Sequence, residues 1–315
     1  MSLFDWRDVD AALLTPIWAE QTARWSQRLF WDAHHSWTQV EAERVAGRLP
    51  GMVLLEGREV AAWTFFLVHQ GTLQIGGFES SSSTATRTLL DAVLRTIDPQ
   101  LAPSGAMLFA FSGAPGLVPA LVARGFDTEP YDYLIRETNA VRPVRPEAPW
   151  DLSAAAQLPG LLARAYGPPA VTRPFVRHGS MSEWREYAAQ LLGSDACGAF
   201  EPGLSAASFD GDGSLQGAIV TTIVGPGTAH IAQVAVDPRQ RGSGLASRML
   251  DSVVERVRAD RLDRVTLLVS ERNSVARRLY ERHGFHEAAT FIAAGRAVPK
   301  SELRTQKSEL DTLHA

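Results

Sequence analysis

The sequence predicts an α/β protein built from two similar domains in tandem, and three observations support this. The chain has 315 residues, more than one ordinary core needs and enough for two domains. The expected helices and strands follow the same order in both halves. A constant shift of 159 positions relates them: it takes Gly284-Phe285 onto Gly125-Phe126, residues 239–244 onto 80–85, and Gln233 onto Gln74. One shift at two landmarks about 40 residues apart indicates an internal duplication with no net insertion between them.

In the first half, hydrophobic periodicity predicts a long helix, a β-hairpin and a third strand, and then a helix, a strand, a short helix and a strand. These elements are expected at residues 11–46, 52–55 with 60–68, 72–78, 84–97, 107–111, 117–124 and 131–136. A proline-rich segment, 143–149, follows them and is the expected linker.

The second half repeats this order after two helices. Helices are expected at 154–166, 182–192, 245–258 and 274–283, and strands at 198–209, 216–224, 230–236, 265–269 and 288–292. We therefore predict one domain at 1–142, a second at 143–298, and a polar tail at 299–315.

Composition narrows the class of protein. The formal net charge is −4, and the mixture of acidic and basic residues argues against nucleic acid as the main partner. A single cysteine excludes a disulfide within the chain and a cysteine-rich zinc site, and we predict no metal. The N-terminus is acidic and lacks the apolar stretch of a signal peptide, and no run approaches ~20 apolar residues, so we expect a cytoplasmic protein outside the membrane. A homodimer is left open.

The segment from Val234 to Ala246 carries the strongest chemical signal. A strand leads into a short loop with Gly242 and Gly244, and the loop opens a helix. The first turn of a helix presents unpaired N–H groups and partial positive charge, which suits phosphate. Glycines let the backbone approach a ligand closely, and Arg239 and Arg241 add charged donors. The loop therefore predicts a pyrophosphate site, but it is neither G-x-G-x-x-G nor a P-loop.

A second motif lies downstream of the next strand: Asn273-x-x-Ala276-x-x-Leu279-Tyr280-x-x-x-Gly284-Phe285. Together with Arg239-x-x-Gly242-x-Gly244, it resembles the two sequence markers of the GNAT superfamily of CoA-dependent N-acyltransferases. The resemblance covers about 145–294 well and reaches the first half only through element order and the constant shift. It implies two GNAT-like domains, each with a mixed, mostly antiparallel central sheet flanked by helices, and acetyl-CoA as cosubstrate.

The resemblance also assigns roles to residues. It implies that the pantetheine arm lies between two splayed strands and bonds the backbone at Val234 and Val236, and that Tyr280 is the general acid for the departing thiolate. The Val234 N–H is the candidate donor to the thioester oxyanion. The remaining implied CoA contacts are Arg239, Gln240, Arg241, Gly242, Ser243, Gly244, Leu245, Asn273 and Ala276.

The general base is the weak point of this interpretation. Many relatives place a glutamate early on the strand before the loop, where this sequence has Ala232 and Gln233. His230 has a suitable ordinary pKa, and Glu271 follows the next strand, so both are candidates. An ordered water relay is the third alternative.

The first half has lost the marker residues. The shift of 159 puts serines on the glycine loop, Leu121 on Tyr280 and Ala114 on Asn273. We therefore expect a degenerate domain that helps to shape the acceptor cleft without binding CoA. Its tryptophans are expected either in the core of the helices or around an acceptor pocket.

The predicted function is acetyl-CoA-dependent N-acetylation of a primary amine on a small molecule by direct transfer. A peptide or protein acceptor is the first alternative. The second is a non-catalytic acyl-CoA-binding sensor, which the missing carboxylate keeps open.

Overall fold

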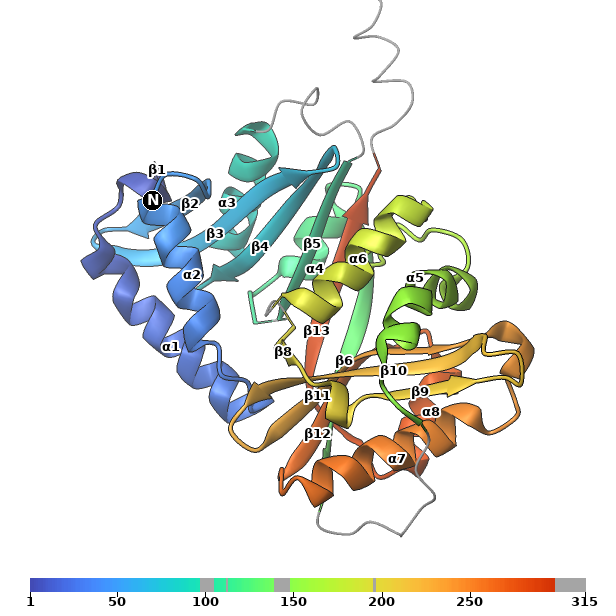
Figure 1. The fold of residues 1–315 in the computed structure, drawn as a ribbon. Coiled ribbons are helices and arrows are strands. Elements are labelled where there is room, and N and C mark those ends of the chain that lie inside the picture. Colours follow the sequence, from blue (N-terminus) through green and yellow to red (C-terminus); the bar gives the residue numbers. More distant parts are fainter. Residues whose placement is uncertain (97–104, 112, 139–147, 195–196, 298–315) are drawn as a thin grey trace, which may run out of the picture.

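A computed structural model describes residues 1–96, 105–111, 113–138, 148–194 and 197–297 (Figure 1). Most of the predicted linker, the predicted boundary at 142/143 and the predicted tail at 299–315 lie outside these ranges. One continuous sheet runs through both halves of the chain, in the order β1-β2-β3-β4-β5-β13-β6-β12-β11-β10-β9-β7. Its neighbours are antiparallel except for β4 with β5 and β11 with β12. The predicted α/β class, with a mixed and mostly antiparallel sheet flanked by helices, is confirmed.

The elements of the first half are β1 (Ser2–Asp5), α1 (Ala11–Leu29), α2 (His34–Val45), β2 (Gly51–Glu56), β3 (Glu59–His69), β4 (Thr72–Ser80), α3 (Ser83–Thr96), β5 (Gly105–Phe111), α4 (Leu117–Val122) and β6 (Asp127–Glu137). Those of the second half are β7 (Ala148–Pro149), α5 (Leu152–Tyr166), α6 (Met181–Gly193), β8 (Ala199–Phe200), β9 (Ala206–Phe209), β10 (Leu215–Gly225), β11 (Thr228–Val236), α7 (Leu245–Ala259), β12 (Arg264–Ser270), α8 (Ser274–Arg282) and β13 (His286–Arg296).

Two predicted elements are wrong, because each was expected to be continuous and is interrupted in the structure. The helix expected at 11–46 divides into α1 and α2 at Phe30, whose backbone is left-handed (φ 54°). The N–H of Asp32 donates to the carbonyl of Val224 at 2.6 Å, so the break contacts the second half. The strand expected at 198–209 is interrupted by a 3-10 turn at Pro202–Leu204, where proline offers no N–H to a ladder. The short strand β1 was not predicted.

The last strand of each half is exchanged with the other half. β13 lies between β5 and β6, and β6 lies between β13 and β12, so each half completes its sheet with a strand of its partner half. In the antiparallel register, Asp127 at the start of β6 pairs with Gly295 near the end of β13, and His286 at the start of β13 pairs with Ile135 near the end of β6. The two strands are therefore related by a nearly two-fold symmetric arrangement. In Figure 1, β13 (red) and β6 (light green) run together through the middle of the molecule.

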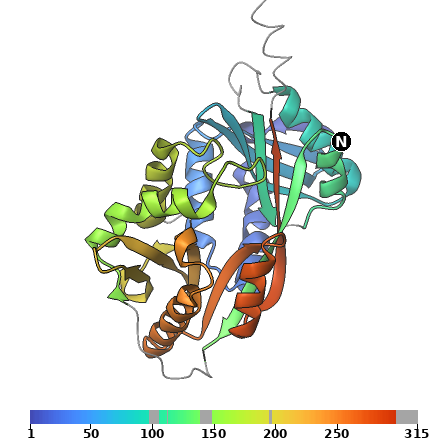
Figure 2. The same ribbon diagram turned by 90° about the vertical axis from the view of Figure 1, so that its right-hand side faces the viewer.

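Helices cover both faces of this sheet (Figure 2). In the first half, α3 and α4 pack apolar side chains such as Leu90, Val93 and Leu121 on one face, as the predicted apolar stripe of α3 requires. In the second half, α7 does the same with Met249 and Val253. α5 and α6 pack on the second half through a separate cluster.

The tryptophans of the first half form their own core. Trp6, Trp18, Trp37 and Trp63 pack against one another with ring centroids 4.8 to 6.4 Å apart, between α1, α2 and the sheet. This contact set favours a packing role for these four side chains over the pocket alternative.

The strand registers correct the predicted constant shift. Ile75 pairs with Leu108, and Ile231 pairs with Leu267, so Ile75 corresponds to Ile231, 156 positions later. Gln74 therefore corresponds to His230 and not to Gln233. The shift of 159 holds only from β5 and β12 onward. The loop after the strand holds Ser81 and Ser82 in the first half but residues 237–244 in the second, so the expectation of no net insertion is wrong.

The segment between α5 and α6, residues 167–180, crosses the exchanged strands. A Cβ built on Gly295 of β13 would lie 1.8 Å from the carbonyl oxygen of Val171. Arg177 donates to the carbonyl of Ala106 on β5 at 3.0 Å. Arg177 of the second half thus contacts β5 of the first half, next to the exchanged strands. Among the described residues, no helix combines the length and apolarity needed to cross a membrane.

We expect Gly295→Ala to destabilise the protein by about 1–3 kcal/mol, because the added methyl overlaps backbone that belongs to another segment. Urea unfolding measures this difference. Gly211→Ala is the matched control, since nothing lies within 4 Å of a Cβ built on Gly211. Equal stability of the two variants would show that the close approach at Gly295 is not a real constraint.

Candidate active site

The sheet opens between β11 and β12. These two parallel strands pair over Thr228–Ile231 and Arg264–Leu267, and no pair is formed beyond Ile231 and Leu267. Residues 232–236 therefore diverge from residues 268–270, which remain paired with β6. The result is a wedge-shaped gap that opens toward the loop at 237–244.

A β-bulge marks the point where the gap begins. On β10, Val220 and Thr221 face Gln233 and Ile231, which leaves Ala232 without a partner. A bulge bends its strand and increases the local twist, which turns the end of β11 away from β12.

The backbone of β11 presents polar groups to the gap. The N–H of Asp237 donates to the carbonyl of Gln216 at 2.8 Å. In an antiparallel ladder, residues that bond to the neighbouring strand alternate with residues that face away from it. Ala235 therefore faces β10 along with Asp237, and Val234 and Val236 turn their N–H and C=O groups into the gap. These are the two residues expected to bond an arm lying there.

The loop beyond β11 has the backbone that its glycines predict. Gly242 and Gly244 have φ of 78° and 79°, a region that side chains disfavour. Gly244 is the N-cap of α7 and gives it no side-chain cap. The first turn of a 15-residue helix thus begins without a side-chain acceptor at its positive end.

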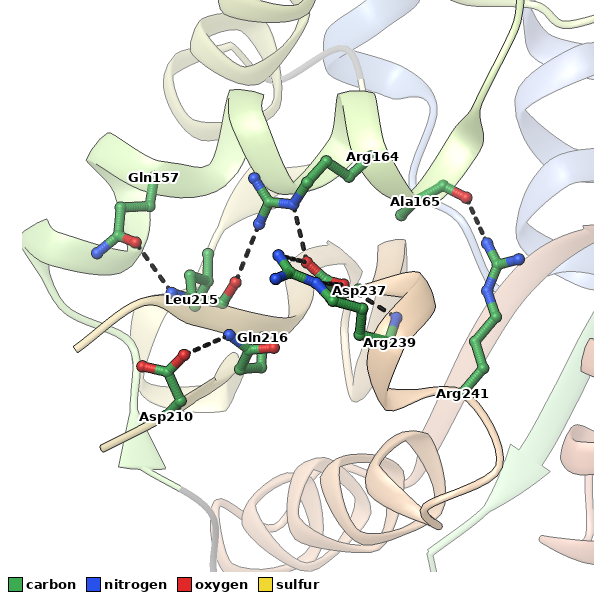
Figure 3. A network of polar contacts seen from close by, with 9 residues as sticks. All are labelled: Gln157, Arg164, Ala165, Asp210, Leu215, Gln216, Asp237, Arg239 and Arg241. Carbon is green, nitrogen blue, oxygen red and sulfur yellow. Dashed lines mark hydrogen bonds and ion pairs between the residues drawn. The ribbon is translucent and has the colours of Figure 1, made fainter. Parts of the chain in front are cut away.

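The two loop arginines contact protein groups (Figure 3). Arg239 pairs with Asp237 at 3.2 Å, and Arg241 donates to the carbonyl of Ala165 on α5 at 2.7 Å. Asp237 also pairs with Arg164 of α5 at 2.8 Å. Asp237 is buried, and its hydrogen bonds from the Arg239 backbone N–H and then from the side chains of Arg239 and Arg164 lower its pKa to about 2. This network ties the start of the loop to α5.

The second motif lies at the other side of the gap. Asn273 is the N-cap of α8, where its side chain accepts from the N–H of Ala276 at 3.1 Å, and it is exposed. Tyr280 lies farther along α8 and is only 6% exposed. Burial, and then the nearby Tyr166, raise the pKa of the Tyr280 phenol, so it stays protonated and able to donate.

His230 is enclosed in the central sheet. It is 4% exposed, its Nδ1 lies 2.9 Å from the hydroxyl of Thr266, and its ring packs against Trp31 and Tyr133. Burial lowers its pKa to about 3. His230 also lies before the gap, on the paired part of β11. This placement favours a neutral core side chain over the role of general base.

Glu271 is exposed just beyond β12. Its N–H donates to the carbonyl of Pro130 at 3.0 Å, and its charge acts on Asp132, which forms an ion pair with Arg277 of α8. That pair lies on the α8 side of the sheet. Neither candidate for the base is thus held in the gap by a described contact.

Sequence reasoning missed a group of polar side chains around the gap. Tyr166 donates to the carbonyl of Val234 at 3.3 Å, and Tyr187 of α6 donates to the side-chain oxygen of Gln233 at 3.2 Å. The amide nitrogen of Gln233 is buried without a hydrogen-bond partner. Glu129 and Tyr131 come from β6 of the first half. No sequence motif joins these residues, since they lie on four elements, and only the strand exchange brings β6 beside β12.

A cavity of about 380 Å³ lies next to this group, between β4 and β5 of the first half and α6 of the second. Tyr187 lines it, together with Gln74, Phe175 and Arg177. Because the Tyr187 hydroxyl also bonds Gln233, this side chain contacts both the cavity and β11. Within the described part of the chain, no three histidine, cysteine or acidic side chains gather as metal ligands.

The corresponding gap in the first half is bridged by hydrogen bonds from α3. β4 and β5 also stop pairing, after Ile75 and Leu108. There, the Thr86 hydroxyl of α3 contacts the Ser80 hydroxyl at 2.5 Å and donates to the carbonyl of Pro115 at 2.7 Å. The start of α3 is thereby fastened across the gap to the loop before α4.

We expect Asp237→Asn to destabilise the protein by about 2 kcal/mol at pH 7, the value of a pKa lowered from 3.8 to about 2. Because the folded pKa lies below the unfolded one, this stability is present above about pH 4 and is lost as the pH falls through the folded value. Urea unfolding of both proteins should thus give a difference that is constant down to about pH 5 and shrinks below it. A difference independent of pH would contradict the role given to this carboxylate.

Comparisons with known proteins agree with this geometry. Residues 172–285 match the model of the acetyltransferase (GNAT) family. The mycothiol acetyltransferase of Beutenbergia cavernae is 36% identical over 86 residues, which are 27% of this chain and 29% of that protein. The mycothiol acetyltransferase of Salinispora tropica is 36% identical over 143 residues, covering 40% of this chain and 45% of that protein. The matches thus span less than half the length of these relatives.

Solved structures share the fold across most of the chain. A GCN5-related N-acetyltransferase from Sphaerobacter thermophilus has a TM-score of 0.60 at 17% identity and covers 78% of this chain and 80% of its own. A tandem GNAT protein from the clavulanic acid biosynthesis pathway has a TM-score of 0.51 at 15% identity, with 80% and 83% covered. The chain therefore carries an acetyltransferase domain of the GNAT family, within the fold of a tandem GNAT protein.

Proposed function

We propose that this protein is a cytoplasmic acetyl-CoA-dependent N-acetyltransferase that acts on a primary amine of a small molecule. The observation that carries the proposal is the gap between β11 and β12, whose polar backbone at Val234 and Val236 leads to the glycine loop and the uncapped start of α7. The names of the two mycothiol acetyltransferases favour a small-molecule acceptor.

The residues around the gap fit the chemistry of acetyl transfer. The backbone N–H groups at the start of α7 suit a pyrophosphate, and Val234 and Val236 suit the amides of a pantetheine arm. The amine attacks the thioester carbon, and the N–H of Val234 stabilises the oxyanion that forms. The carbon–sulfur bond then breaks, and the protonated Tyr280 hydroxyl donates to the departing thiolate.

We further propose that only the second half binds acetyl-CoA. The first half lacks six of the eight loop residues, and its gap is bridged by the Thr86 hydroxyl. Its contribution would then be to the walls of the acceptor site. The predicted domains at 1–142 and 143–298 are thus proposed as two functional units, one binding acetyl-CoA and one shaping the acceptor site, although strand exchange joins their sheets into one.

Calorimetry should give one acetyl-CoA per chain, and Gly242→Ala should weaken that binding at least tenfold. The alanine must adopt a φ of 78° in a loop that is to hold the pyrophosphate. Gly57→Ala imposes a similar strain in the β2–β3 turn, where φ is 66° and nothing lies within 4 Å of the new Cβ, and should leave the affinity unchanged. Two binding events, or equal effects of the two variants, would refute this assignment.

Tyr280→Phe should lower kcat by about 10²-fold or more while leaving acetyl-CoA binding intact, because only the proton donor to the thiolate is lost. The measurement is release of free thiol across a panel of amines. Tyr133→Phe is the control: its buried hydroxyl donates to the carbonyl of Leu29 on α1 at 2.8 Å and has no proposed part in the transfer.

The same screen decides between the alternatives. Thiol release with peptides and none with small amines would indicate a peptide or protein acceptor. Tight acetyl-CoA binding without thiol release for any amine would indicate the non-catalytic sensor.

A further inference from the structure

Glu129 is a buried carboxylate at the rim of the gap. It lies on β6 and is 8% exposed, although ionised carboxylates are rarely buried without partners. Its Oε1 accepts from the hydroxyl of Ser270, the last residue of β12, and its Oε2 accepts from the hydroxyl of Thr172 at 2.5 Å. Glu129 is thus fixed to the strand that forms one wall of the gap.

Several buried phenols surround the gap beside Glu129. Burial, and then the charge of Glu129, raise the pKa of Tyr131, two residues along the same strand. On the other wall, the Tyr166 hydroxyl donates to the carbonyl of Val234 at 3.3 Å, and Tyr166 also raises the pKa of Tyr131. Tyr166 in turn affects Tyr280. Buried phenols therefore lie on both sides of the gap: Tyr131 on β6, Tyr166 beside β11 and Tyr280 on α8.

The carboxylate is present on one of the two exchanged strands only. β6 borders β12 and the open gap, whereas β13 borders β5 and the bridged gap. The shift of 159, which holds for these two strands, places Ala288 and Thr290 of β13 at the positions of Glu129 and Tyr131. The first half thus supplies a carboxylate and a phenol to the open gap, and the second half supplies neither to the bridged one.

We propose that Glu129, which the first half contributes, is the catalytic base of the second half: it binds the acceptor's ammonium group and takes the proton that this group must lose. This inference rests on the proposed acetyltransferase function. The proton passes from the ammonium to the carboxylate, and the free amine attacks the thioester carbon. As the carbon–nitrogen bond forms and the carbon–sulfur bond breaks, the second proton of the nitrogen leaves to replace the one that Tyr280 gives to the thiolate.

The charged and titratable groups around Glu129 come from several elements. Arg272, in the loop after β12, lies 3.7 Å from Oε2 and is mostly exposed. Tyr131 lies two residues from Glu129 on β6. Arg173, next to Thr172, carries a positive charge that acts on Tyr131. The Arg173 guanidinium donates to the backbone carbonyls of Phe175 and Val176, at 3.1 and 2.7 Å, and packs over the ring of Trp184. An incoming ammonium would thus find Glu129 as the buried anion of this group.

The test compares Glu129→Gln and Glu129→Asp with the wild-type protein, using an amine that the thiol-release screen identifies as an acceptor. We expect Glu129→Gln to lower kcat/KM about 10²-fold or more and to abolish the loss of activity that protonation of the base causes at acid pH. Glu129→Asp should retain the acid limb at reduced activity. Acetyl-CoA affinity should be unchanged in both variants, because the carboxylate contacts the acceptor.

Two further variants separate this role from a structural one. Thr172→Val removes one hydrogen-bond donor to the carboxylate but keeps the carboxylate itself, so the variant should stay active and retain the acid limb. Glu137→Gln is the control on the same strand, since this half-exposed side chain lies 3.7 Å from Arg264 at the other end of β6. It should match the wild type.

The outcomes distinguish this inference from the proposed function. A wild-type protein that releases no thiol with any amine contradicts the proposed function itself. A wild-type protein that turns over, with Glu129→Gln within threefold of it and the same pH profile, overturns the role of Glu129 and leaves the proposed function standing.

Discussion

The exchange of β6 and β13 is the constraint on which the rest of this structure depends. It joins two sheets into one, because β13 of the second half pairs with β5 of the first and β6 of the first half pairs with β12 of the second. It also builds the candidate site: the wall of the open gap is β12, and β12 is held by β6 from the other half. The segment at 167–180 passes over the exchanged strands and places the Thr172 hydroxyl within hydrogen-bond distance of Glu129.

The gaps of the two halves share their strand pairing and differ in the loop that follows it. Both keep the parallel pair that parts after its fourth residue, and both keep an irregular register on the strand before the loop. The open gap leads to residues 237–244 with two left-handed glycines. The bridged one has only Ser81 and Ser82 there, and the Thr86 hydroxyl bonds the Pro115 carbonyl across it.

Local signals in the sequence predicted most elements and the positions of the loop and of α8. The glycines at 242 and 244 and the N-cap at Asn273 are local features, so their backbone could be expected from nearby residues alone. The break at Phe30 could not, because Asp32 bonds Val224 nearly 200 residues away. The strand exchange could not be predicted from local signals either, because the apolar pattern of β6 is the same whether the strand pairs with β12 or with a strand of its own half. Glu129 was missed for that reason.

The near-symmetric register of β6 with β13 has a consequence for the two gaps. In a homodimer built from one such unit, two copies would exchange their last strands and the two gaps would be identical. Here both units lie in one chain, so the two gaps can carry different residues, and Glu129 lies beside one gap without a counterpart beside the other.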